Sequence, residues 1–143
     1  MIGRVIGLDP GERRIGVAVS DPTGTIASPD RYIDTRTESV GVVLQEICAE
    51  RQAALIVVGL PISLDGSEGP SAARAREFGA SVAEATGLDV VFHDERFTSH
   101  TAEAALIAGG VRRKARKEKR DQIAAAVMLQ SYLDRRKNDE DRQ

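Results

Sequence analysis

The sequence is poor in aromatic residues and in cysteine. Aromatic residues make up 3% of the 143 residues and Trp is absent, so the core must be built from aliphatic side chains. The single cysteine, Cys48, excludes an intramolecular disulfide, and no cysteine cluster exists that could hold zinc. Cys48 falls in a helical pattern beside Ile47, which favours a buried core thiol.

Long hydrophobic runs are also absent. No apolar run approaches the ~20 residues that a membrane-spanning helix needs, and the first residues resemble a strand rather than a signal peptide. The composition, 41% hydrophobic and 29% charged, is typical of a folded globular chain. We therefore expect a cytoplasmic protein with one domain over residues 1–138 and a short polar tail over 139–143.

Hydrophobic periodicity predicts an α/β fold. The expected strands are residues 4–9, 15–19, 25–33, 54–60 and 90–95, and the expected helices lie near 40–47, 71–85, 98–108 and 121–136. The first three strands form an antiparallel meander, whereas the later strands are continuously apolar and separated by helices, which favours parallel pairing. Right-handed crossovers then predict a five-stranded mixed sheet of order 3-2-1-4-5 with helices on both faces.

Two acidic residues end predicted strands at the same edge of this sheet. Asp9 ends the first strand and Glu95 ends the fifth, which runs parallel to it. A ligand crevice forms at this edge, where the winding of the sheet changes direction. A carboxylate at the end of a buried strand is costly unless it is paired or bound to a cation. Asp94 competes with Glu95, because adjacent strand residues face opposite sides.

A third carboxylate lies in the first turn of the last predicted helix. Asp121 shares a helix face with Ala124, Ala125 and Met128, whose apolar side chains are expected to pack on the sheet. With Asp9 and Glu95 it would form a site for Mg²⁺ or Mn²⁺, two of which can promote phosphodiester hydrolysis. Taken alone, Asp9 also fits a turn residue and Asp121 a helix cap.

A basic run precedes Asp121. Residues 112–120 contain seven basic side chains and one acidic, although the net charge of the whole chain is -2. We expect Arg112, Arg113 and Lys114 to bind a polyanionic substrate. The alternative is a solvated face with no ligand.

Four segments resemble the pre-16S rRNA nuclease and Holliday-junction-resolvase-like family (YqgF/RuvX). They are GLDPGERRIGVAVSD (7–21), VGLPISLDGSEGP (58–70), DERFTS (94–99) and DQIAAAVMLQSYL (121–133). The resemblance covers nearly the whole chain and implies a ribonuclease H-like fold. It also implies a metal-dependent nuclease that processes the 5′ end of pre-16S rRNA. A resolvase of four-way DNA junctions is the alternative within the same class.

The resemblance assigns the acidic catalytic and metal-binding residues to Asp9, Glu95 and Asp121, and so selects Glu95 over its acidic neighbour. Departures are small: Arg13 stands where the family usually has Lys, and Ser99 where it usually has Thr. Both substitutions keep the charge or the hydroxyl group, so the assignment holds.

Other positions are candidate substrate contacts. Gly11 allows a tight turn or a close approach to the substrate. Arg13, Arg14 and Arg96 are candidate phosphate contacts, although Arg96 could instead orient its neighbour. Thr98 is a further candidate contact, with capping of the following helix as the alternative.

Two functions from other classes compete with a nuclease. The GLDPG segment (7–11) also resembles the phosphate-binding hairpin of actin-like ATPases and sugar kinases, but those proteins close two domains around ATP. A non-catalytic nucleic-acid binder would leave the three carboxylates unexplained. His93 and His100 lack metal-ligand spacing, so we interpret both as structural. The chain is expected to bind nucleic acid as a monomer or homodimer, and symmetric resolution of a junction would need the dimer.

Neutralising the start of the basic run tests its role. Replacing Arg112, Arg113 and Lys114 together by Gln should weaken nucleic-acid binding, because fewer counterions are released from the phosphates. The slope of log K against log salt should flatten by about 2. Fluorescence anisotropy over a salt series measures both quantities. Unchanged affinity would show that the run is only a solvated face.

Overall fold

The computed structural model describes residues 3–98 and 120–141, with side chains from residue 122 onward in the second segment. The strands are β1 (Arg4–Pro10), β2 (Arg14–Ser20), β3 (Ala27–Asp34), β4 (Ala53–Leu60) and β5 (Val90–Asp94). The helices are α1 (Val40–Arg51), α2 (Pro70–Thr86), the single 3₁₀ turn η1 (Glu95–Phe97) and α5 (Arg120–Asp141). Residues 99–119 lie outside the described residues. They include nearly all of the helix expected at 98–108, His100, and the basic run with Arg112, Arg113 and Lys114 up to residue 119.

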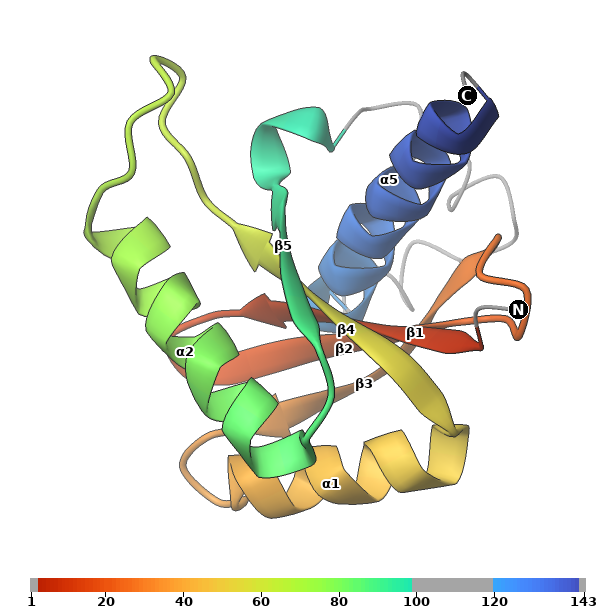
Figure 1. The fold of residues 1–143 in the computed structure, drawn as a ribbon. Helices are drawn as coiled ribbons and strands as arrows, with labels where there is room; N and C mark the ends of the chain where they lie inside the picture. Colours follow the sequence, from red (N-terminus) through yellow and green to blue (C-terminus); the bar gives the residue numbers. More distant parts are fainter. Residues whose placement is uncertain (1–2, 99–119, 142–143) are drawn as a thin grey trace.

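The five strands form one mixed sheet of order β3-β2-β1-β4-β5, which confirms the predicted order (Figure 1). β2 pairs antiparallel with both β1 and β3, whereas β4 pairs parallel with β1 and β5. The carboxyl ends of β1, β4 and β5 therefore lie at the same edge of the sheet. This edge is where the two predicted strand-end carboxylates were expected.

Helices cover both faces of the sheet, as predicted. α1 and α2 lie on one face and α5 on the other (Figure 1). Alternate residues of the central strands point to opposite faces of the sheet, and each face has its own buried hydrophobic cluster. Leu8 belongs to one cluster and Val57 to the other. Both clusters are almost entirely aliphatic, in line with the scarcity of aromatic residues. Among the described residues, no helix has the length and apolar character needed to span a bilayer.

Helix α5 lies unusually close to the central strand. A Cβ atom on Gly7 of β1 would be only 2.8 Å from Cβ of Leu129, so the missing side chain is what lets the helix approach. Ala125 and Met128 of α5 are buried against the sheet, as predicted, but Ala124 is exposed and the prediction for it was wrong. A residue three positions after Asp121 is rotated away from the sheet, whereas those four and seven after it face inward.

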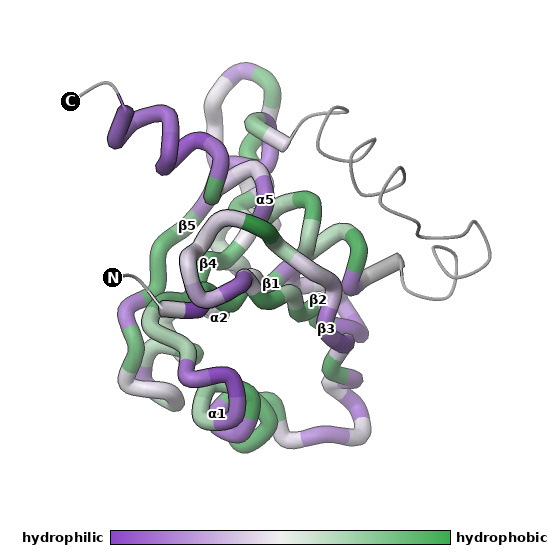
Figure 2. Tube along the Cα trace, turned by 90° about the vertical axis from the view of Figure 1, so that its right-hand side faces the viewer, coloured by the Kyte–Doolittle hydropathy of each residue, from purple (hydrophilic) through white to green (hydrophobic). Residues whose placement is uncertain are grey.

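Two segment ends differ from the predictions. β5 ends at Asp94 rather than Glu95, because the Asp94 carboxylate accepts the backbone N–H of Arg96 at 2.9 Å and so starts the turn η1. α5 continues to Asp141, beyond the expected end near residue 136. Figure 2 shows its last turns as hydrophilic, in contrast to the hydrophobic strands. The chain thus extends a polar helix away from the core.

The close approach of α5 predicts the effect of one added methyl group. Gly7→Ala should lower the free energy of unfolding by about 1–3 kcal/mol, because the new Cβ would overlap Leu129. Gly41→Ala in helix α1 is the matched control, since its Cβ would lie at an ordinary 3.5 Å from Cβ of Ala85 in α2. The control should hold or raise stability. Urea unfolding measures both variants, and equal values would contradict this packing.

Candidate active site

Asp9 and Glu95 meet at the carboxyl edge of the sheet. Asp9 is the penultimate residue of β1, and Glu95 is the first residue of η1, directly after β5. Between them runs β4, which has Gly59 at this level. A Cβ on Gly59 would lie 2.8 Å from Glu95 Oε1 and 3.6 Å from Asp9 Oδ1. The two carboxyl groups therefore occupy the space that a side chain at position 59 would fill.

Gly59 was not among the predicted site residues. A glycine inside an otherwise apolar strand indicates a close approach by another group, so the sequence did contain a signal for it. The structure shows that the approaching groups are the two carboxyl groups. Any larger residue at this position would have to displace one of them.

The electrostatics of the pair follow from its surroundings. Burial, the negative charge of Asp9 and a hydrogen bond to Asp9 raise the pKa of Glu95 to about 7. Below about pH 7 the protonated form of Glu95 is therefore favoured, and its O–H is donated to Asp9. Near neutral pH the two groups therefore hold a proton between them, and a bound cation could replace it.

The donor atoms suit a hard divalent cation. Both side chains offer carboxylate oxygens, which Mg²⁺ and Mn²⁺ prefer. Among the side chains that the structure describes, no cluster of three acidic, histidine or cysteine residues is present. Asp121 is the second residue of α5, but its side chain lies outside the described set. Two of the three predicted carboxylates are thus seen together, and the third belongs to the first turn of the helix that packs on β1.

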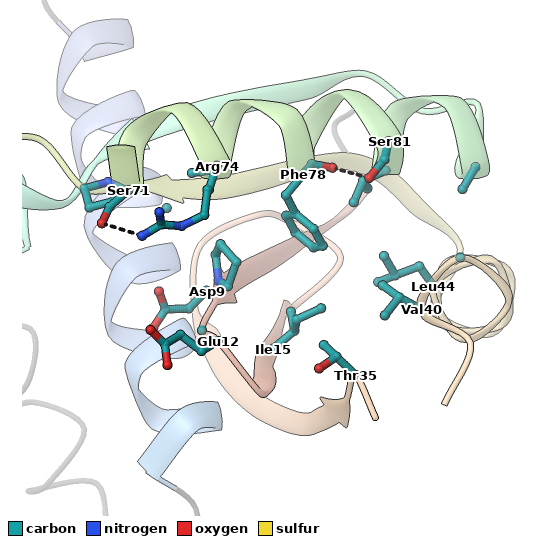
Figure 3. Close-up of a pocket in the computed structure, with 18 of the residues that line it drawn as sticks. Asp9, Glu12, Ile15, Thr35, Val40, Leu44, Ser71, Arg74, Phe78 and Ser81 are labelled. Carbon is teal, nitrogen blue, oxygen red and sulfur yellow. Dashed lines mark hydrogen bonds between the residues drawn. The ribbon is translucent and has the colours of Figure 1, made fainter. Parts of the chain in front are cut away.

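A cleft of about 1040 Å³ opens beside the pair and runs between α1 and α2. Figure 3 shows Phe78 of α2 pointing into it from above, with Ile15 and Leu44 on the opposite side. Asp9 and Arg74 lie toward the same end, where Arg74 donates a hydrogen bond to Ser71 Oγ at 3.1 Å. The cleft therefore has apolar walls and a charged end.

Arg74 is a cationic group of the site that the sequence analysis missed. It is exposed and lines the same cleft as Asp9 and Glu95. No local motif identifies it, because its role depends on where helix α2 packs. An exposed cation beside a carboxylate pair is suited to contact phosphate.

The predicted contacts around the β1–β2 turn have structural roles in this state. Gly11 N–H donates to the Arg14 carbonyl at 2.9 Å, and a Cβ on Gly11 would lie 2.8 Å from that oxygen. Gly11 is thus required by the tight turn. Arg13 Nε lies 4.0 Å from Asp34 Oδ2, and the Arg14 guanidinium lies 4.8 Å from the Tyr32 ring centroid. Both arginine side chains reach the surface beside the site.

The other two predicted contacts flank Glu95. Arg96 forms a forked ion pair with Asp94, in which Nη2 donates to Oδ2 at 2.7 Å, so it contacts Asp94 rather than orienting Glu95. Thr98 donates its backbone N–H to the Glu95 carbonyl at 3.0 Å. Its hydroxyl is buried and has no hydrogen-bond partner among the described residues. These contacts close the turn that carries Glu95.

The sheet order and the helical layers on its two faces define the class of fold: ribonuclease H-like. The solved structure of Thermus thermophilus RuvC in complex with a Holliday junction substrate shares the fold, with a TM-score of 0.62 over 95% of this chain and 96% of that chain, at 15% identity. The chain belongs to the RuvX family, whose model, described as Holliday junction resolvase, matches residues 3–135. This membership confirms the resemblance found in the four sequence segments.

Relatives of known name cover nearly the whole chain. A protein of Lactococcus lactis subsp. lactis (strain IL1403) named "Putative pre-16S rRNA nuclease" is 41% identical over 141 residues, which cover 94% of this chain and 96% of the relative. A protein of the same name from Syntrophomonas wolfei is 43% identical over 132 residues, covering 92% and 94%. The family and these relatives agree on the class of enzyme, a nuclease.

The shared proton predicts a pH dependence of stability. The folded protein keeps a proton on Glu95 up to about pH 7, whereas the unfolded chain releases it near the ordinary pKa of 4.5. The free energy of unfolding in EDTA should therefore fall as pH rises from 5 to 8, by about 2 kcal/mol. Glu95→Gln should remove most of this decline, because Gln does not titrate. Urea unfolding across this pH range measures both proteins, and parallel curves would contradict the coupling.

Proposed function

We propose that the chain is a divalent-metal-dependent nuclease that hydrolyses phosphodiester bonds of structured nucleic acid, with maturation of the 5′ end of pre-16S rRNA as its role. The observation that carries the proposal is the half-buried pair of Asp9 and Glu95 at the charged end of a large cleft. The names of the relatives support rRNA as the substrate. Such a role belongs to the cytoplasm.

Asp9, Glu95 and Asp121 are the residues that would hold Mg²⁺ or Mn²⁺, with two ions in the substrate-bound state. The described pair fits a cation because two carboxyl groups in this half-buried position retain a proton that a cation could replace. When bound, divalent cations supply activation of an attacking water and neutralisation of charge on the leaving oxygen. The protein contributes the fixed positions of the carboxylates.

The remaining site residues orient the substrate in this proposal. Arg74 at the end of the cleft, with Arg13 and Arg14 at the surface, would bind phosphate groups on either side of the scissile bond. Arg96 and Thr98 belong to the turn that carries Glu95, and the tight turn at Gly11 would let its backbone approach the substrate. The basic run would add further phosphate contacts at longer range.

Resolution of four-way DNA junctions is a second candidate. The description of the matching family model as a Holliday junction resolvase favours it. Symmetric cleavage of a junction needs two active sites and therefore a homodimer, whereas processing of one RNA end needs only a monomer. The two candidates can thus be separated by substrate and by oligomeric state together.

Asp9→Asn should abolish cleavage while fold and nucleic-acid binding stay largely intact, because Asn keeps the shape but loses the charge that a cation requires. Cleavage would be assayed on pre-rRNA fragments, single-stranded RNA and four-way DNA junctions. Each assay is run with Mg²⁺, with Mn²⁺ and with a chelator. Circular dichroism and anisotropy measure folding and binding of the variant.

Asp89→Asn is the matched control. Asp89 is exposed and directly precedes β5, so it lies at the opposite edge of the sheet from Glu95. This variant should cleave like the wild-type protein. Cleavage that survives in Asp9→Asn, or in the presence of chelator, would refute the metal-dependent mechanism.

A further inference from the structure

Two buried polar side chains, His93 and Ser131, are hydrogen-bonded to each other next to the turn that carries Glu95. His93 of β5 and Ser131 of α5 are each 6% exposed, and His93 Nε2 lies 2.9 Å from Ser131 Oγ. Ser131 Oγ also lies 2.8 Å from the carbonyl oxygen of Phe97, the last residue of η1. One hydroxyl group of α5 therefore joins strand β5 and the adjoining turn η1, both of which are distant from α5 in the sequence.

The protons in this chain of hydrogen bonds can be assigned. A carbonyl oxygen only accepts, so Ser131 donates its single hydroxyl proton to Phe97. Ser131 must then accept from His93, which places a proton on Nε2 of the ring. Burial of the ring lowers the pKa of His93 and so favours the neutral imidazole. Every hydrogen of the link therefore has a defined donor and acceptor.

The link ties η1 to the rest of the fold. Within the turn, Thr98 N–H donates to the Glu95 carbonyl at 3.0 Å, and the Asp94 carboxylate accepts Arg96 N–H at 2.9 Å. Both bonds lie within five consecutive residues, so they shape the turn but do not fix it relative to α5. The bond from Ser131 to the turn does fix it.

A second contact from α5 reaches the same residue of the turn. The Arg135 guanidinium carbon lies 3.7 Å from the centroid of the Phe97 ring, a cation–π distance. Arg135 follows Ser131 by about one helical turn, so both side chains project from the same face of α5. Phe97 is thus held by its carbonyl group and by its ring.

We propose that Ser131, oriented by His93, is a positioning residue that fixes the Glu95 turn against α5, the helix whose second residue is the candidate metal ligand Asp121. The inference rests on the nuclease function proposed above. Ser131 acts through the backbone of Phe97 and sets where the Glu95 carboxyl group lies relative to the other acidic residues. Loss of the hydroxyl would remove the bond to the Phe97 carbonyl and leave the N–H of the buried His93 ring without its Ser131 partner.

Kinetics of paired variants test this role. Ser131→Ala should lower kcat for cleavage about tenfold while KM stays within about twofold of wild type, as is typical when the support of a metal ligand is removed. Ser131→Thr keeps the hydroxyl and should retain most of kcat. His93→Gln keeps an N–H donor and should exceed His93→Leu in kcat, which gives a second test if the added methyl of Thr does not fit.

Ser20→Ala controls for a purely structural effect. Ser20 is also buried, accepts Val5 N–H at 2.8 Å and donates to the Asp21 carbonyl at 2.9 Å. It is the last residue of β2 and lies beside the amino end of β1, away from the site. It should lose stability to a similar degree and yet keep kcat. If Ser131→Ala retains as much kcat as Ser20→Ala, the positioning role is overturned.

Amide hydrogen exchange of the metal-free protein gives a readout that needs no cleavage. The Thr98 amide should exchange about tenfold faster in Ser131→Ala than in wild type, while the Leu8 amide in β1 stays protected. Unchanged exchange at Thr98 would overturn the inference whether or not the protein cleaves. Faster exchange together with an inactive wild-type protein would instead overturn the proposed nuclease function. It would still support the role of Ser131 in fixing the Glu95 turn against α5.

Discussion

Asp9 and Glu95 approach each other over a strand position that has no side chain, in half-buried surroundings. Two negative charges in such a place repel, and the protein relieves the repulsion by keeping a proton on one of them. The sheet order makes the approach unavoidable, because β4 alone separates β1 from β5 and all three strands point the same way. The arrangement is therefore suited to a cation, which would remove the repulsion without protonation.

The two helical layers serve this centre in different ways. On one face of the sheet, α5 packs closely on β1 at Gly7, so the helix that carries Asp121 lies close to the central strand. On the other face, α1 and α2 leave a cleft with apolar walls that ends beside Asp9. The layer of α5 is thus closely packed, whereas the cleft on the other face leaves room for a ligand beside the carboxyl pair.

Periodicity and connection rules were sufficient to predict the sheet order and to place Asp9 at its switch point, because both depend on regular alternation along the chain. They failed where a side chain acts on a neighbouring backbone. Asp94 caps Arg96 and so turns Glu95 out of the strand, which no hydrophobic pattern reveals. The bond between His93 and Ser131 joins residues distant in sequence, so only the assembled fold could show it.

Gly59 contributes space, and no reactive group, to the site of the carboxyl pair. It neither binds a ligand nor transfers a proton, yet its bare backbone provides the volume in which the two acids meet. A design that grafts acidic residues onto another sheet would therefore need an unsubstituted strand position between them. In a survey of natural variation, such a glycine would be as restricted as the acids themselves, for a purely steric reason.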